Sequence, residues 1–246
     1  MLPCGKRILL ILETMMLEAK GLYSFYGKSP ILQDIDFQIE DGGFLGIVGR
    51  NGVGKTTLLR TIMGLTDRAN GTLSFQGANL LNMSTPERAA TGIAYIPQGR
   101  EVIPRFTVRE NLLMGMFPRA DKSRSIPEHI FELFPILSDF IDRLGGDLSG
   151  GQQQQLAIGR ALAMNPKVLI LDEPTEGIQP NIVQQIEEVI RKLNRDMGLT
   201  IVIVEQNTRF VRQAADSFVL LDKGRVALRG RGEELTSEVI DQYLAI

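Results

Sequence analysis

The sequence is poor in the residues that cross-link small secreted domains and bind zinc. Its 246 residues include one cysteine, Cys4, one histidine, His129, and no tryptophan. A single cysteine excludes an internal disulfide framework and fits a reducing compartment, and one histidine with one cysteine leaves almost no ligands for a zinc site. Lysines and arginines number 27 against 29 acidic residues, a net charge of −2. The chain therefore lacks the basic character of a nucleic-acid-binding protein, and we expect no nucleic-acid partner.

Long hydrophobic runs are also missing. The apolar run near the start, Ile8–Leu12, ends at Glu13, far short of the roughly 18–20 apolar residues that span a bilayer. It is also shorter than the hydrophobic part of a secretory signal, and no small-residue cleavage site follows it. We therefore expect residues 1–15 to be an N-terminal extension, with Met16 as a possible natural start, and the chain not to cross a membrane by itself.

Hydrophobic patterning predicts an α/β fold over residues 16–246. Apolar and polar residues alternate over 17–25 and 31–39, which indicates antiparallel strands. Continuously apolar runs are typical of strands buried on both faces of a sheet, and they occur at 44–48, 168–171 and 200–204. Helical spacing and turn signals predict helices at 86–91, 108–116, 128–140, 152–164 and 182–197, a hairpin at 218–228 and a closing helix at 233–243. We expect a helical subdomain at about 99–155.

Residues Gly49–Thr56 satisfy the phosphate-loop pattern and lie between a predicted buried strand and a predicted helix, which is the context that the pattern requires. Glycines let main-chain N–H groups converge on phosphate oxygens, and the helix N-terminus adds its positive dipole end. Lys55 is expected to meet the β- and γ-phosphates, and the Thr56 hydroxyl to bind magnesium. The alternative is a glycine-rich turn with an exposed lysine. The nucleotide contacts predicted in this loop are Gly49, Asn51, Gly52, Gly54, Lys55, Thr56 and Thr57.

Two carboxylates, Asp172 and Glu173, follow the apolar run at 168–171, where a parallel sheet forms its ligand crevice. Asp172 is expected to hold magnesium, directly or through water. Glu173 is expected to orient or deprotonate the attacking water of an in-line displacement at phosphorus, with Lys55 stabilising the charge. The alternative is that the two acids only cap the next helix.

A third motif, Leu148-Ser-Gly-Gly-Gln152, precedes another predicted helix. Ser149 is a good N-cap, and the glycines leave space for an anion at the helix N-terminus. A single nucleotide site needs only one such helix end, so the second either binds another anion or completes a site on a partner molecule. The alternative is an ordinary capped helix.

The three motifs, in this order and spacing, resemble those of the ATP-binding subunits of ABC transporters over roughly residues 17–244. The resemblance implies a P-loop ATPase core with an antiparallel β subdomain and an inserted helical subdomain. It implies ATP and Mg²⁺ as cofactors, and two subunits that sandwich two ATP molecules, each held by the phosphate loop of one and by residues Ser149, Gly150, Gly151 and Gln152 of the other. It also implies that Tyr26 stacks on adenine and that Gln98 senses magnesium and links to the membrane subunit. Taken singly, both are ordinary residues.

Two departures from the family pattern narrow the resemblance. The loop after Glu173 lacks the usual aspartate, and Gln206 stands where the family has a switch histidine. Gln206 is able to hydrogen-bond a γ-phosphate but carries no titrating proton. Hydrolysis should then depend more on Glu173, and pairing with a second, different ATPase subunit becomes attractive.

These substitutions resemble the importer branch for branched-chain amino acids and amides, most closely the urea importer's second ATPase subunit. The resemblance implies ATP hydrolysis that energises uptake at the cytoplasmic face of the inner membrane, with a homodimeric or heterodimeric ATPase, membrane permease subunits and, indirectly, a solute-binding protein as partners. The alternative is a soluble ABC ATPase that remodels a protein partner, of the iron–sulfur assembly type.

Overall fold

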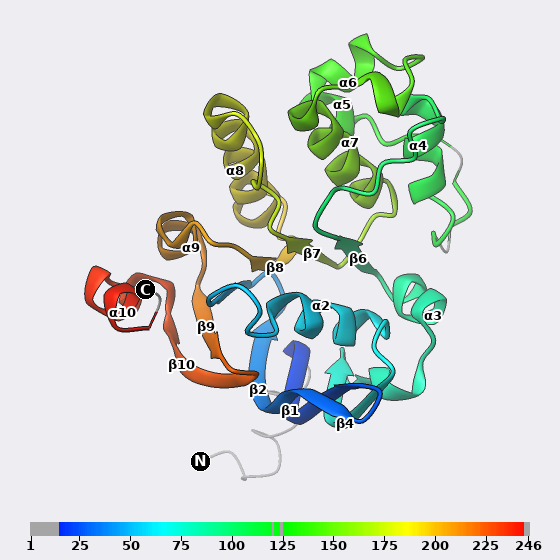
Figure 1. The fold of residues 1–246 in the computed structure, drawn as a ribbon. Coiled ribbons are helices and arrows are strands. Elements are labelled where there is room, and N and C mark those ends of the chain that lie inside the picture. Colours follow the sequence, from blue (N-terminus) through cyan, green and yellow to red (C-terminus); the bar gives the residue numbers. More distant parts are fainter. Residues whose placement is uncertain (1–14, 120, 124, 244–246) are drawn as a thin grey trace, which may run out of the picture. The chain divides into compact units, whose positions relative to one another are not determined.

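The structure is a computed structural model that describes residues 15–119, 121–123 and 125–243 (Figure 1). They form two compact units, one of residues up to 88 together with those from 200 onward, the other of residues 89–199. The predicted extension at 1–15 lies outside the described residues except for Met15, which begins strand β1. The predicted bounds of the domain and of its helical subdomain stay predictions. No described helix combines the length and apolar character needed to span a membrane.

The first unit contains the antiparallel strands that the alternating patterns predict. Strand β1 (Met15–Tyr26) pairs with β2 (Ser29–Glu40), and Ala19 lies opposite Phe37. Two further strands, β4 (Arg68–Phe75) and β5 (Ala78–Asn79), extend this sheet in the order β2-β1-β4-β5. Neither was predicted, because most side chains of β4 are polar or small and only Leu73 and Phe75 are buried.

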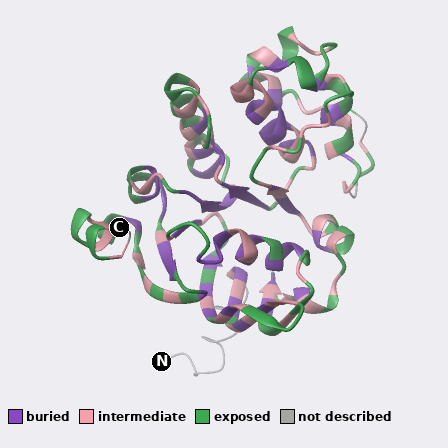
Figure 2. Ribbon diagram, in the orientation of Figure 1, coloured by how far each residue is buried: buried purple, intermediate pink, exposed green. Residues whose placement is uncertain are grey.

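A second group of strands in this unit has the order β10-β9-β3-β8. Strand β3 (Phe44–Val48) runs parallel to both β8 (Thr200–Val204) and β9 (Ser217–Asp222). Parallel pairing is expected for strands that are buried on both faces of a sheet. All residues of β3 and β8 are buried, and β8 is coloured so in Figure 2. Strand β10 (Arg225–Arg231) pairs antiparallel with β9, which confirms the predicted hairpin.

Two helices of the first unit each follow a buried parallel strand. Helix α2 (Lys55–Met63) follows β3 and buries its apolar face, and α9 (Thr208–Ala214) follows β8. The predicted closing helix is divided into a 3₁₀ turn, η3 (Gly232–Glu234), and α10 (Ser237–Tyr243). Another 3₁₀ turn, η1 (Leu80–Asn82), precedes α3 (Thr85–Ala90), at which the first unit ends.

The second unit combines a pair of parallel strands with helices. Strand β6 (Ile93–Ile96) pairs with β7 (Val168–Asp172), and β6 was not predicted because four residues are too few to show a period. The α4–α7 segments are drawn in green in Figure 1. The helical elements of this unit are α4 (Val108–Gly115), α5 (His129–Leu133), α6 (Pro135–Asp139), η2 (Gly145–Asp147), α7 (Gly150–Ala163) and α8 (Pro180–Arg195).

One helix prediction in this unit is wrong. The continuous helix expected at 128–140 is two short helices, α5 and α6, which meet at Phe134. Proline has no N–H to donate and favours the first turn of a helix, so Pro135 begins α6 and prevents α5 from continuing.

Helices α4 and α7 approach closely at Gly115, where a Cβ atom would lie 1.9 Å from the carbonyl oxygen of Arg160.

Candidate nucleotide-binding site

The phosphate loop lies between β3 and α2, as predicted. Three of its glycines have positive φ, at 154° for Gly49, 79° for Gly52 and 108° for Gly54, a conformation that side chains rarely adopt. Gly54 is the N-cap of α2 and offers no side chain to cap the first N–H groups. The phosphate loop therefore leads into a helix whose first N–H groups have no side-chain cap, and such a helix N-terminus is able to bind phosphate.

Two of these glycines are also required by close contacts. A Cβ atom on Gly49 would lie 2.6 Å from the carbonyl oxygen of Leu221, and one on Gly54 would lie 2.8 Å from Cδ2 of Leu32. Leu32 is fully buried. The loop is therefore packed against β2 and the end of β9, which limits its conformation.

Lys55 is buried, with 5% of its surface exposed, which differs from the exposed lysine of the glycine-rich-turn alternative. Its Nζ donates hydrogen bonds to the carbonyl oxygens of Gly49 (2.9 Å) and Arg50 (3.1 Å). The ammonium group thus lies within the curve of the loop, where it places a positive charge beside the main-chain N–H groups. Thr56 and Thr57 follow on the first turn of α2.

Tyr26 and Gln206 are placed in the same unit. Tyr26 is half-buried at the end of β1, and Gln206 is exposed in the segment between β8 and α9. Its neighbour Glu205 is 3% exposed and accepts a hydrogen bond from the Gln206 N–H (3.1 Å). Asn207 caps α9 by accepting from the N–H of Phe210 (3.2 Å).

Glu205 thus fixes the backbone that carries Gln206, a role that the sequence reasoning missed. Its only signal was an acidic residue directly after a buried strand.

Asp172 is the last residue of β7 in the second unit, and Glu173 directly follows the strand. Asp172 is 1% exposed, and the hydroxyl of Tyr95 donates to its Oδ2 at 3.3 Å. Glu173 has a φ of 48°, which is uncommon for a residue with a side chain and is typical of positions where a functional site imposes strain. Helix α8 has Gln179 as its N-cap, so neither carboxylate caps it. Tyr95 was missed because it lies in the unpredicted strand β6.

The third motif forms the N-terminus of α7, which begins two residues earlier than predicted. Ser149 and Gln152 form a capping box: the Gln152 N–H donates to Ser149 Oγ (3.4 Å) and the Ser149 N–H donates to Gln152 Oε1 (2.9 Å). The N-cap prediction for Ser149 is confirmed. A Cβ atom on Gly150 would lie 2.9 Å from Nη1 of Arg100, and one on Gly151 would lie 2.7 Å from Cγ2 of Ile182.

Gln98 is exposed after β6, and its Nε2 donates to Oε2 of Glu176 at 2.6 Å. Arg100 donates from Nη2 to the carbonyl oxygen of Glu176 at 3.4 Å. Its own carbonyl accepts from Nη2 of Arg160 at 3.3 Å, and burial lowers the pKa of Arg160 while Glu101 opposes this effect. The structure thus joins the loop that carries Gln98 to the turn after Glu173, and neither Glu176 nor Arg100 was predicted as a site residue.

The predicted residues are accordingly distributed over both units. Tyr26, the phosphate loop and Gln206 belong to the first unit, whereas Gln98, residues 149–152, Asp172 and Glu173 belong to the second. Within the described residues, no group of three His, Cys, Asp or Glu is arranged to hold a metal ion.

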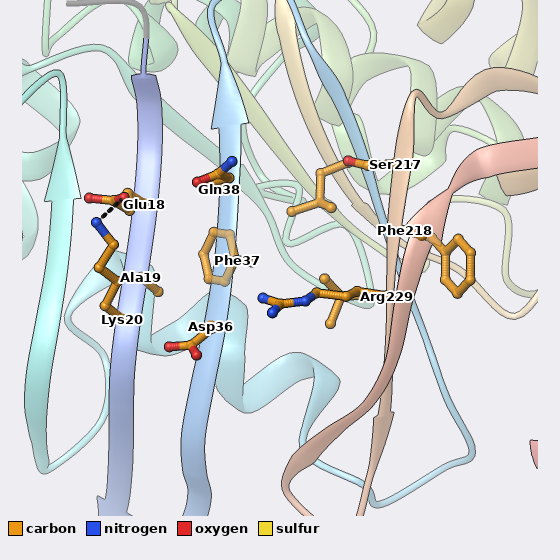
Figure 3. Close-up of a pocket in the computed structure, with 12 residues that line it drawn as sticks. Glu18, Ala19, Lys20, Asp36, Phe37, Gln38, Ser217, Phe218 and Arg229 are labelled. Carbon is orange, nitrogen blue, oxygen red and sulfur yellow. Dashed lines mark ion pairs between the residues drawn. The ribbon is translucent and has the colours of Figure 1, made fainter. Parts of the chain in front are cut away.

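A cavity of about 750 Å³ in the first unit is separate from these residues (Figure 3). Its lining comes from β1, β2, β3, β9 and β10 and includes none of the predicted site residues. Figure 3 shows the ion pair of Glu18 with Lys20 on β1 (2.6 Å) and the side chain of Arg229 from β10. The predicted nucleotide contacts thus lie outside this cavity.

Known proteins that resemble this chain are ATP-binding proteins of ABC transporters. The model of the ABC transporter family matches residues 32–176. The high-affinity branched-chain amino acid transport ATP-binding protein BraG of Pseudomonas aeruginosa is 39% identical over 93% of this chain and 99% of its own length. The probable branched-chain amino acid transport ATP-binding protein LivF of Archaeoglobus fulgidus is 38% identical over 89% and 94%.

Solved structures agree with the fold. A nucleotide-free ATP-binding cassette from an ABC transporter superposes with a TM-score of 0.78 at 29% identity, covering 92% of this chain and 95% of that one. A cassette in a dimeric post-hydrolysis state with bound ADP and Pi gives a TM-score of 0.77 at 26% identity, covering 88% and 98%.

Proposed function

Because this chain belongs to the ABC transporter family and is an ATP-hydrolysing importer subunit, we propose that it energises the uptake of branched-chain amino acids or urea. The observation that carries the nucleotide part of this proposal is the β3–loop–α2 unit, in which three positive-φ glycines precede the buried Lys55. This arrangement presents N–H groups, a helix N-terminus and an ammonium to one bound polyphosphate.

The magnesium ligands that we propose are Thr56, Gln98 and Asp172. Asp172 is almost wholly buried and accepts a hydrogen bond from the Tyr95 hydroxyl at 3.3 Å, which orients its carboxylate. Hydroxyl, amide and carboxylate oxygens are also the ligands that Mg²⁺ accepts. When bound, the ion would neutralise charge on the β- and γ-phosphates.

The protein groups then divide the work of hydrolysis. Lys55 exchanges its bonds to the Gly49 and Arg50 carbonyls for the β- and γ-phosphate oxygens, and Tyr26 stacks on adenine. Glu173 orients the attacking water and accepts its proton in the displacement at phosphorus. Gln206 donates a hydrogen bond to the γ-phosphate, and because a glutamine does not titrate, the proton transfer rests with Glu173.

The α7 N-terminus supports a site shared between two ATPase subunits. Residues Ser149, Gly150, Gly151 and Gln152 would face the γ-phosphate held by the partner's phosphate loop. The partner is a second copy or, given Gln206 in place of histidine, a different ATPase subunit. Membrane permease subunits, contacted through the loop of Gln98, would place the complex at the cytoplasmic face of the inner membrane. A solute-binding protein would act through the permease.

Two solutes have separate support. BraG and LivF, both named for branched-chain amino acid transport, favour these amino acids. The segments at 49–55, 97–102, 149–156 and 173–180 resemble the urea importer's second ATPase subunit, which favours urea. The soluble protein-remodelling alternative is not favoured, because the curated relatives are transport and import subunits.

Deletion of the gene tests the solute. Loss of growth on leucine as sole nitrogen source, with growth on urea retained, supports the amino-acid importer, and the reverse supports the urea importer. Normal growth on both would contradict both assignments. The chain should also fractionate with membranes only when its permease subunits are present, and persistent recovery without any permease would contradict the transporter assignment.

A further inference from the structure

We propose that Glu176 is a positioning residue that sets which end of the Gln98 amide is offered to magnesium. This inference rests on the role that the proposed function gives to Gln98. It concerns the turn after Glu173, in which the Glu176 N–H donates to the Glu173 carbonyl oxygen at 3.2 Å.

The side chains of Glu176 and Gln98 differ in how they form hydrogen bonds. An ionised carboxylate only accepts hydrogen bonds, whereas an amide has a donor end and an acceptor end. With Gln98 Nε2 donating to Glu176 Oε2 at 2.6 Å, the donor end of the amide is held by Glu176. The carbonyl oxygen, which is the end that is able to bind a cation, is therefore directed away from Glu176. A neutral partner would accept either end of the amide and would lose this discrimination.

The backbone of the same loop explains why an external contact is needed. Gly99, Arg100 and Glu101 have successive positive φ values of 85°, 72° and 46°, and residues with side chains persist in this region only when their surroundings enforce it. Arg100 provides a second link, by donating to the Glu176 carbonyl oxygen at 3.4 Å. Glu176 thus contacts the loop through its side chain and through its backbone.

The effect is expected on orientation and not on stability. Gln98 and Glu176 are both exposed, and exposed polar contacts change the stability of a fold little. Loss of the side-chain contact should loosen residues 97–101 by the amount that one hydrogen bond contributes, about twofold to tenfold in a local opening equilibrium.

The test compares Glu176→Ala and Glu176→Gln with Glu188→Ala, a control at an exposed glutamate on α8. In the nucleotide-free protein, amide hydrogen exchange of residues 98–101 should rise about twofold to tenfold in Glu176→Ala, less in Glu176→Gln and not in the control. The Mg²⁺ concentration for half-maximal ATP turnover should rise most in Glu176→Ala, less in Glu176→Gln and not in the control. The melting temperature of each variant should stay within about 2 °C of the wild-type value.

Unchanged exchange in Glu176→Ala would overturn the inference, as would an unchanged Mg²⁺ dependence. Gln98→Ala separates the inference from its premise. If Gln98→Ala leaves the Mg²⁺ dependence unaltered, the role proposed for Gln98 is wrong. If Gln98→Ala alters it and Glu176→Ala does not, Gln98 keeps its role and only the positioning by Glu176 is refuted.

Discussion

Replacing Gly54 by alanine tests whether the phosphate loop is held by sterics as well as by hydrogen bonds. Gly54 has a φ of 108°, and an added Cβ would lie 2.8 Å from Cδ2 of the buried Leu32. Strained backbone of this kind costs about 1–3 kcal/mol, and overpacking a buried contact costs about 1–3 kcal/mol more. Since Leu32 Cδ2 is the end of a flexible side chain, we expect Gly54→Ala to lower stability by about 2–4 kcal/mol.

Two other glycines provide matched controls. Gly52 and Gly77 share a φ of 79°, are exposed, and have no atom within 4 Å of an added Cβ. Alanine at either position should cost about 1–2 kcal/mol through the backbone alone. Only Gly52 belongs to the phosphate loop, so Gly52→Ala should weaken ATP binding while Gly77→Ala should leave it unchanged.

The measurements are thermal unfolding and titration with a fluorescent ATP analogue, which is free of tryptophan background because the chain has none. The account requires Gly54→Ala to lower the melting temperature more than Gly77→Ala, by about 2–4 °C for each additional kcal/mol. Equal stability of these two variants would refute the steric argument. Equal ATP affinity of Gly52→Ala and Gly77→Ala would refute the role of the loop backbone.

Three further substitutions test separate parts of the site and fold. Lys55→Ala should abolish ATP binding or turnover, and unchanged turnover would remove Lys55 from the site. Gln206→His should bind nucleotide about as tightly as the wild type, and complete loss of binding would show that Gln206 has a packing role. Asn111 is fully buried and bonds the backbone of Ile103, Phe106 and Thr107. Asn111→Ala should therefore destabilise the protein by about 2–4 kcal/mol in urea unfolding, and a loss below about 0.5 kcal/mol would contradict this.

Much of the fold was predictable where one periodicity dominated. The fully apolar runs gave β3, β7 and β8, and strict alternation gave β1 and β2. Strand β4 could not be predicted because most of its pairing is with β1, which is far away in sequence, and its own side chains show little pattern. Pro135 was visible in the sequence, but the helical period on either side of it concealed the break between α5 and α6.

The candidate site was predictable at its motifs and not in the contacts that hold them. The motif rules select Asp172 and Ser149 by residue type and spacing, and the family resemblance adds Gln98; the roles of all three residues stay predictions. Tyr95 against Asp172 and Glu176 against Gln98 depend on tertiary placement. Neither pair has a sequence period or motif that relates its members, since 77 and 78 residues separate them.

Turnover by Glu173→Gln tests the central claim, that this chain hydrolyses ATP with Glu173 as the group that activates water. The substitution keeps the shape of the side chain and removes its charge and basicity. The account predicts that the purified variant binds ATP with Mg²⁺ at least as tightly as the wild type, forms a stable ATP-bound dimer and releases phosphate at least about 100-fold more slowly. Phosphate release at a near-normal rate would contradict it.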